Sequence, residues 1–174
     1  MKMKSINELY AEGRSIVEEC CGDVIGDITD ISINTRSQKR WGLCHHNLKN
    51  DTLQIQISKR ILLDEVPYDA TLSVMIHEIL HACEGGQSHK GMWKVYAKKV
   101  MDKYPELVIT RTNSSDFFGL EPRKRPERIY AVQCDTCGKV IRRARKVYVI
   151  KHPEVCIHKY CGGHFTNISQ TERV

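Results

Sequence analysis

Three histidines and one glutamate in the middle of the chain have the types and spacing of a metal-dependent hydrolase. His77-Glu78-Ile79-Leu80-His81 is an HExxH pattern within a segment expected to be helical. Histidines four residues apart differ by about 40° around a helix axis, so both imidazoles can bind one metal ion. Glu78 lies about 100° from His77, near the metal without occupying it. The pattern predicts a zinc site beside a general base.

Such a site would hydrolyse peptide bonds. Zinc lowers the pKa of a bound water to about 7, which makes hydroxide available in neutral solution. Glu78 would accept the proton of that water and pass it to the leaving amine. The alternative is that His77 and His81 are ordinary surface histidines on a helix without a catalytic role. The apolar opposite side of the helix and the Gly85-Gly86 break after it favour the catalytic interpretation.

A catalytic zinc site uses three protein ligands, so one more ligand is expected. A turn after Gly85-Gly86 could return His89 to the metal. Glu84 is the rival, because it falls on the same helical face as His77. It lies about 10 Å further along the axis, however, which is far for a ligand. We therefore predict three ligands for the catalytic zinc: His77, His81 and His89.

The C-terminal segment carries a second set of metal-binding residues. Cys134 and Cys137 form a CxxC pair, and Cys161 is the expected third ligand. The fourth ligand is left open, because His158 matches the usual spacing whereas Cys156 would complete four thiolates. His152 and His164 are weaker candidates. Four protein ligands close the coordination shell, so this second zinc would be structural and needed for folding.

Composition indicates a globular chain of 174 residues, with 41% hydrophobic and 28% charged residues. No apolar run approaches the roughly 18 residues of a membrane span, and no apolar segment follows the basic start Met1-Lys2-Met3-Lys4-Ser5. We expect a cytoplasmic protein that can associate with the nucleoid, is monomeric and contacts no membrane. In that reducing compartment, eight cysteines indicate metal ligands and buried thiols instead of disulfides.

The net charge of +6 comes entirely from the tail. Residues 121–174 hold twelve Lys/Arg and five Asp/Glu, whereas residues 1–120 hold fifteen and sixteen. The tail includes a basic segment, expected to be a strand, that ends in an aromatic residue. Such a surface suits phosphate contacts and base stacking on DNA that is single-stranded or that is bound without sequence preference. The alternative is that this basic segment is only a solvated face of a strand and binds no DNA. The candidate DNA contacts are Arg142, Arg143, Arg145, Lys146 and Tyr148.

Hydrophobic periodicity predicts the elements that position these residues. Helices are expected at 5–20, 68–84 and 90–104, and strands at 27–34, around 40–43 and at 53–58. We therefore predict an α+β fold: residues 1–120 form a metalloprotease domain with a small antiparallel or mixed sheet packed on helices and HExxH on the central helix. Residues 121–128 form a linker, and residues 129–174 form a small β zinc ribbon.

The chain resembles the SprT-like zinc metalloproteases, which include the DNA–protein crosslink protease Spartan. The resemblance rests on four runs: Asn34-Thr35-Arg36 with Arg40-Trp41-Gly42-Leu43-Cys44, Ile55-Gln56-Ile57-Ser58, His77-Glu78-Ile79-Leu80-His81 and His89-Lys90-Gly91-Met92-Trp93. It implies a zincin-like fold, and it implies His89 as the third ligand. The family often ends in a ribbon with CxxC in both halves, from which this chain departs at one position.

The resemblance also implies a substrate peptide lying along the strand before the zinc helix. Trp41 on that strand is either part of this edge or simple core. His45 and His46 are expected on a hairpin turn, and Tyr96 is a weak candidate for stabilising the oxyanion. The leading hypothesis is a zinc endopeptidase that acts on DNA-associated or DNA-crosslinked proteins. The alternative is a nucleic-acid-binding zinc protein without protease activity.

Overall fold

The computed structural model describes residues 3–37, 39–122 and 126–168. The chain divides into two compact units, Met1–Pro122 and Arg123–Val174. Each unit has its own buried core and its own three-stranded sheet. Residues 123–125 of the predicted linker lie outside the described residues. The fold class is α+β, and none of the helices within the described ranges has the length and apolar character needed to cross a membrane.

The first helix, α1 (Ile6–Cys21), begins and ends at residues with specific capping chemistry. The Ser5 hydroxyl accepts a hydrogen bond from the Glu8 backbone N–H at 3.3 Å, and this satisfies a donor of the first turn. Gly22 ends the helix with φ 83°, in the region that only glycine enters easily. Leu9 and Val17 are fully buried, so one face of α1 packs on the core as predicted.

The sheet of the first unit is mixed. Its strands are β1 (Ile28–Asn34), β2 (Gly42–Asn47) and β3 (Thr52–Ser58), in the order β1-β3-β2. β1 runs parallel to β3, whereas β2 runs antiparallel to it. Among the described residues β2 therefore forms an edge of the sheet.

The position of β2 corrects one prediction. We expected a strand around residues 40–43 and a turn at His45 and His46, but both histidines lie within β2 and pair with Gln54 and Leu53. The turn follows at residues 48–51 and includes Asp51 at φ 52°. Pairing with β3 extends this strand, although its sequence lacks a regular alternation of apolar residues.

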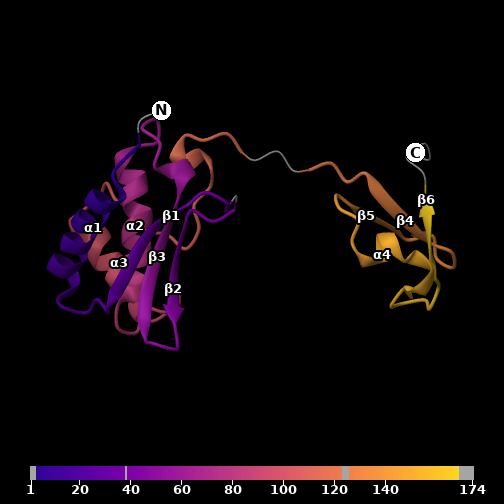
Figure 1. The fold of residues 1–174 in the computed structure, drawn as a ribbon, viewed down its shortest axis with the longest axis horizontal. Helices are drawn as coiled ribbons and strands as arrows, with labels where there is room; N and C mark the ends of the chain where they lie inside the picture. The colour runs from indigo at the N-terminus through magenta and orange to yellow at the C-terminus, as the bar shows by residue number, and fades with distance from the viewer. Residues whose placement is uncertain (1–2, 38, 123–125, 169–174) are drawn as a thin grey trace. The chain divides into compact units, whose positions relative to one another are not determined.

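The helix α2 (Tyr68–Ala82) is the central element of the first unit. It contacts α1, α3 (Met92–Lys103), β2 and β3, and the helices cover one face of the sheet (Figure 1). Eleven of its fifteen residues are buried. The helix ends before the predicted residue 84, because Cys83 turns into an extended conformation and Glu84 donates a backbone hydrogen bond to Val24 at 2.9 Å. Cys83 is fully buried.

The second unit is a small antiparallel sheet. Its strands are β4 (Tyr130–Cys134), β5 (Val140–Arg143) and β6 (Phe165–Ile168), in the order β5-β4-β6. A short helix, α4 (Tyr148–Lys151), contributes Ile150 to the core. The prediction of one basic strand through Tyr148 is wrong. β5 ends at Arg143, because the chain must turn back for Ile150 to pack against the sheet.

Candidate zinc centre and cleft

The structure brings the three predicted histidines together at one point. His77 and His81 project from α2, and His89 approaches from the segment before α3. The His89 Nε2 atom lies 2.9 Å from the Nε2 atom of His77 and 3.1 Å from that of His81. Three ligands at 2.0–2.1 Å from a tetrahedral zinc would have their nitrogens ~3.4 Å apart. The three imidazoles thus fit one zinc ion after a small outward movement.

Hydrogen bonds to two backbone carbonyls orient two of these rings. The Nδ1 atoms of His77 and His81 lie 2.9 Å from the carbonyl oxygens of Thr110 and Gly86, respectively. A carbonyl only accepts, so each Nδ1 carries the proton and each Nε2 keeps its lone pair for a metal. Glu84, the rival ligand, is exposed and lies outside this cluster.

Burial keeps these histidines neutral, as metal binding requires. Desolvation, followed by the neighbouring charges of His81 and His89, lowers the pKa of His77 to about 4. Desolvation also lowers the pKa values of His81 and His89. The indole of Trp93 contributes to this burial, since its centroid lies 4.9 Å from the rings of His77 and His89 and 5.7 Å from that of His81.

Glu78 is buried beside the edge strand. Only 6% of the residue is exposed, and burial raises the pKa of its carboxyl to about 8, opposed by a backbone hydrogen bond from Cys44 and by the charge of Arg40. This value applies without a metal, and a divalent cation nearby would lower it. A proton acceptor with a pKa near neutrality is suited to general acid–base chemistry.

Gly42 makes room for that carboxylate. A Cβ atom at residue 42 would lie 2.4 Å from Oε1 of Glu78 and 2.7 Å from its Cγ. Real Cβ atoms do not approach this closely, so a side chain at residue 42 would displace Glu78. The position of the candidate base thus depends on a glycine in β2, which sequence reasoning did not single out.

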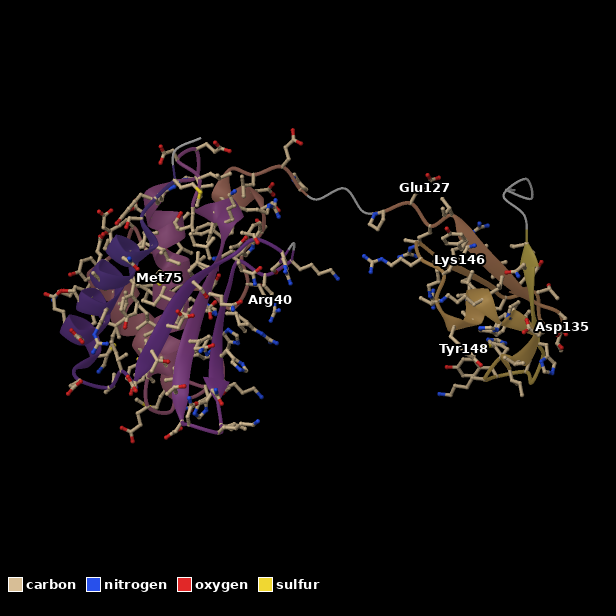
Figure 2. The ribbon with its side chains drawn as sticks, viewed as in Figure 1. Arg40, Met75, Glu127, Asp135, Lys146 and Tyr148 are labelled. Atoms are coloured by element: carbon tan, nitrogen blue, oxygen red, sulfur yellow. The ribbon has the colours of Figure 1, made fainter. Side chains whose placement is uncertain are left out.

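A cleft of about 580 Å³ opens onto the zinc centre. This volume falls in the range typical of ligand sites, roughly 300–1,000 Å³. One wall is formed by β2 and the residues before it, including Arg40 (Figure 2), and Glu78 and the three histidines lie at its base. Residues 110–113 form a further part of the wall.

The segment 110–113 is a part of the site that sequence reasoning missed. It holds His77 through the Thr110 carbonyl, and the Asn113 carbonyl accepts a hydrogen bond from the Trp41 indole at 2.9 Å. Trp41 therefore packs on the core, 4.5 Å from the Phe118 ring, and also lines the cleft. The available sequence signal was the apolar run Leu107-Val108-Ile109. Its first and last residues are buried, and the Val108 N–H donates to the Ser73 hydroxyl of α2 at 3.0 Å.

The other candidates lie as follows. His46 lines the cleft and has its Nε2 atom 2.7 Å from the Asp51 carboxylate, whereas His45 does not line it. Tyr96 does not line the cleft, and its hydroxyl donates to the Glu84 carbonyl at 3.2 Å. Tyr96 therefore cannot stabilise an oxyanion at the zinc centre from this position.

The second unit brings together three cysteines and one histidine. His158 Nδ1 lies 3.2 Å from Cys137 Sγ and 3.0 Å from Cys161 Sγ, and Cys134 Sγ lies 3.5 Å from Cys161 Sγ. Sulfurs around a tetrahedral zinc are ~3.8 Å apart, so the four side chains fit one ion. Cys156 instead packs against the core of the unit. Of the two alternatives for the fourth ligand, the geometry favours His158.

The weaker ribbon candidates lie elsewhere. His164 Nδ1 donates to the Glu154 carbonyl at 2.9 Å, and His152 Nδ1 lies 3.9 Å from the Glu154 carboxylate. The predicted DNA contacts are exposed on the same unit: Arg142, Arg143, Arg145, Lys146 and Tyr148. Lys146 and Tyr148 are labelled in Figure 2.

Comparison with known proteins adds one finding. A model of the SprT-like family matches residues 3–113, which span most of the first unit and nearly two-thirds of the chain. The match includes the three histidines and Glu78, and it ends before the second unit. No curated protein matches the chain.

Proposed function

Because the chain belongs to the SprT-like family, we propose that its first unit is a zinc-dependent endopeptidase. The observation that carries the proposal is the convergence of three imidazole Nε2 atoms beside a buried glutamate at the base of one cleft. Three protein ligands leave one coordination position for water or substrate, as catalytic zinc sites require. A purely structural site would use a fourth protein ligand and would have no need of the carboxylate.

The edge strand β2 offers a place for an extended peptide. Ser58 donates a backbone hydrogen bond to the Trp41 carbonyl at 2.8 Å, and bonded positions alternate along an antiparallel pair. Gly42, Cys44 and His46 therefore direct their backbone groups away from β3. The Cys44 N–H donates to the Glu78 carboxylate, and the other groups face the open side of β2. A substrate strand that paired there would pass the cleft with its backbone held in register.

Each residue then has a defined task. A zinc ion held by His77, His81 and His89 would polarise the scissile carbonyl and lower the pKa of a water molecule there. Glu78 accepts a proton from the attacking water and returns it to the leaving amine. The backbone hydrogen bond from Cys44 and the lack of a side chain at residue 42 keep that carboxylate in position.

The direct test is cleavage of an unfolded protein, such as reduced casein, by the zinc-loaded chain. We expect fragments that disappear after chelation and return when two equivalents of zinc are added, one for each site. Measurements with and without single-stranded DNA reveal whether DNA stimulates the reaction. Cleavage that persists in the chelated chain, with residual zinc excluded by mass spectrometry, would contradict a zinc peptidase.

For the second unit we propose binding of DNA without sequence preference. Four exposed cations lie close together in the chain. The Tyr148 ring lies 4.9 Å from the His152 ring, and Tyr148 is 66% exposed, which leaves ring surface for stacking. Cations contact phosphates, and an exposed aromatic ring stacks on bases of any sequence. The unit would thereby bring the peptidase to proteins that are bound or crosslinked to DNA. The second candidate function, DNA binding without proteolysis, rests on the same surface.

Arg142→Glu tests this DNA contact. We expect about a tenfold weaker affinity for a single-stranded oligonucleotide at low salt, and a salt dependence reduced by about one phosphate contact. Fluorescence anisotropy over a salt series measures both quantities. Lys99→Glu is the matched control, because it makes the same charge change at an exposed residue of α3 in the first unit. Equal losses in both variants would mean that only net charge matters and would refute a specific surface.

A further inference from the structure

A second cavity of about 410 Å³ lies beside the zinc centre. It shares three lining residues with the main cleft: His89, Thr110 and Arg111. A peptide in the cleft could therefore place one side chain into this cavity, next to the residue at the zinc. The cavity is formed within the first unit, between α3 and the segment that precedes Thr112.

The cavity combines an apolar lining with cations. Trp93, Ala97 and Ile109 are each less than 5% exposed, and Met101 is half-buried beside them. Lys90, Lys94 and Arg111 are exposed and complete the lining. Among the described residues that form this cavity there is no carboxylate. A ligand that fits has carbon atoms for the apolar surface and a negative charge for the three cations.

Basic residues outnumber acidic residues in the linings of these two cavities. Residues 1–120 carry one more acidic than basic residue. Yet the linings of the two cavities together contain five cations, Lys39, Arg40, Lys90, Lys94 and Arg111, and a single carboxylate, that of Glu78. A cleft with an excess of positive charge attracts negatively charged ligands, even when the unit as a whole is nearly neutral.

We propose that the cavity formed by Trp93, Ala97, Met101 and Ile109, with Lys90, Lys94 and Arg111, is a substrate subsite for an acidic side chain, glutamate in particular. This inference rests on the proposed peptidase function and specifies its substrate class. The glutamate methylenes lie on the apolar lining, and the carboxylate binds the cations. Arg111 and His89 line both cavities, so the subsite adjoins the zinc centre.

A peptide side chain fits these features better than a nucleic-acid backbone does. A phosphate backbone contacts cations on an open surface, whereas a glutamate side chain can enter a cavity and bury its two methylenes against Trp93 and Ile109. The cavity is concave, and its apolar residues lie next to a metal centre suited to peptide hydrolysis. Binding of DNA at this cavity is therefore the outcome that would overturn the proposal.

The first experiment compares cleavage of peptides that differ only by Glu or Gln at each position around the scissile bond. We expect about tenfold higher kcat/KM for Glu at one position adjacent to the cleaved bond, because only the Glu carboxylate forms charge-assisted hydrogen bonds with the cations of the subsite. Lys94→Glu should abolish or reverse this preference, measured as the ratio of kcat/KM for the Glu peptide to kcat/KM for the Gln peptide. Lys99→Glu, on the same helix but outside both cavities, should retain it.

A binding measurement keeps the subsite testable even if no peptidase activity exists. In the zinc-loaded Glu78→Gln chain, a Glu peptide should bind about tenfold more tightly than its Gln counterpart, and Lys94→Glu should remove the difference. No cleavage of any peptide but discrimination in binding would refute the enzyme and leave the subsite. Cleavage without discrimination would refute the subsite alone, as would a loss of DNA affinity in Lys94→Glu that Lys99→Glu does not share.

Discussion

Replacing Glu78 by glutamine is expected to lower kcat/KM for peptide hydrolysis about a thousandfold while both zinc ions remain bound. General acid–base catalysis contributes roughly 10²–10⁴-fold, and an amide cannot accept the proton of the attacking water. The variant should fold normally, because glutamine has nearly the same shape and is neutral at a buried position where the carboxyl pKa is raised to about 8. Kinetics with a fluorogenic peptide and zinc analysis by native mass spectrometry measure the two effects.

Glu84→Gln is the matched control for that experiment. It makes the same chemical change six residues further along the chain, at an exposed position outside the histidine cluster. Its activity and zinc content should equal those of the unaltered chain. If Glu78→Gln retained full activity, the assignment of the general base would be wrong. If instead the unaltered chain cleaved no substrate, with or without DNA, the alternative of a nucleic-acid-binding protein without protease activity would be favoured.

The second large effect is expected for Cys134→Ala, which should lose one of two zinc ions and unfold the second unit. Within the described residues 126–168, the core cluster of this unit contains four buried residues: Val132, Cys134, Ile150 and Phe165. So small a core cannot fold a unit by itself, whereas a structural zinc contributes about 10–16 kcal/mol of apparent binding free energy. Native mass spectrometry should record one zinc, and the NMR resonances of residues 126–168 should collapse to unfolded positions.

Two further variants identify the fourth ligand of this site. His158→Ala should lose the same zinc, whereas Cys156→Ala should keep two zinc ions per chain and lose only about 1 kcal/mol of stability from packing. The first unit should stay folded and hold its zinc in each case, because its core is separate. Loss of zinc in Cys156→Ala with retention in His158→Ala would reverse the assignment of the ligand.

The zinc helix and the core of the first unit could be predicted because their signals are local. HExxH places two imidazoles on one helical face by geometry alone, and Leu53, Ile55 and Ile57 predict β3 by strict alternation. The capping pattern that begins at Ser5 likewise defines the start of α1. In these places propensity, periodicity and burial favour the same element.

The remaining parts of the site depend on contacts between distant segments. The carbonyl that orients His77 belongs to Thr110, 33 residues away, and the glycine that accommodates Glu78 lies on another element. The length of β2 was underestimated because pairing with β3 sets it, not its own pattern. The choice between His158 and Cys156 was open because spacing and thiolate affinity favour different residues. The approach of His158 to two sulfurs and the packing of Cys156 against the core favour His158.

The close approach of residue 42 to Glu78 has a consequence for how such proteins lose activity. A single methyl group added to the edge strand would push the carboxylate aside without touching an imidazole or opening the core. The resulting protein would still fold and bind zinc, but it would be inactive as a peptidase. Metal content is therefore an incomplete criterion for an active member of this family, and the residue that faces the glutamate from the strand should be inspected as well.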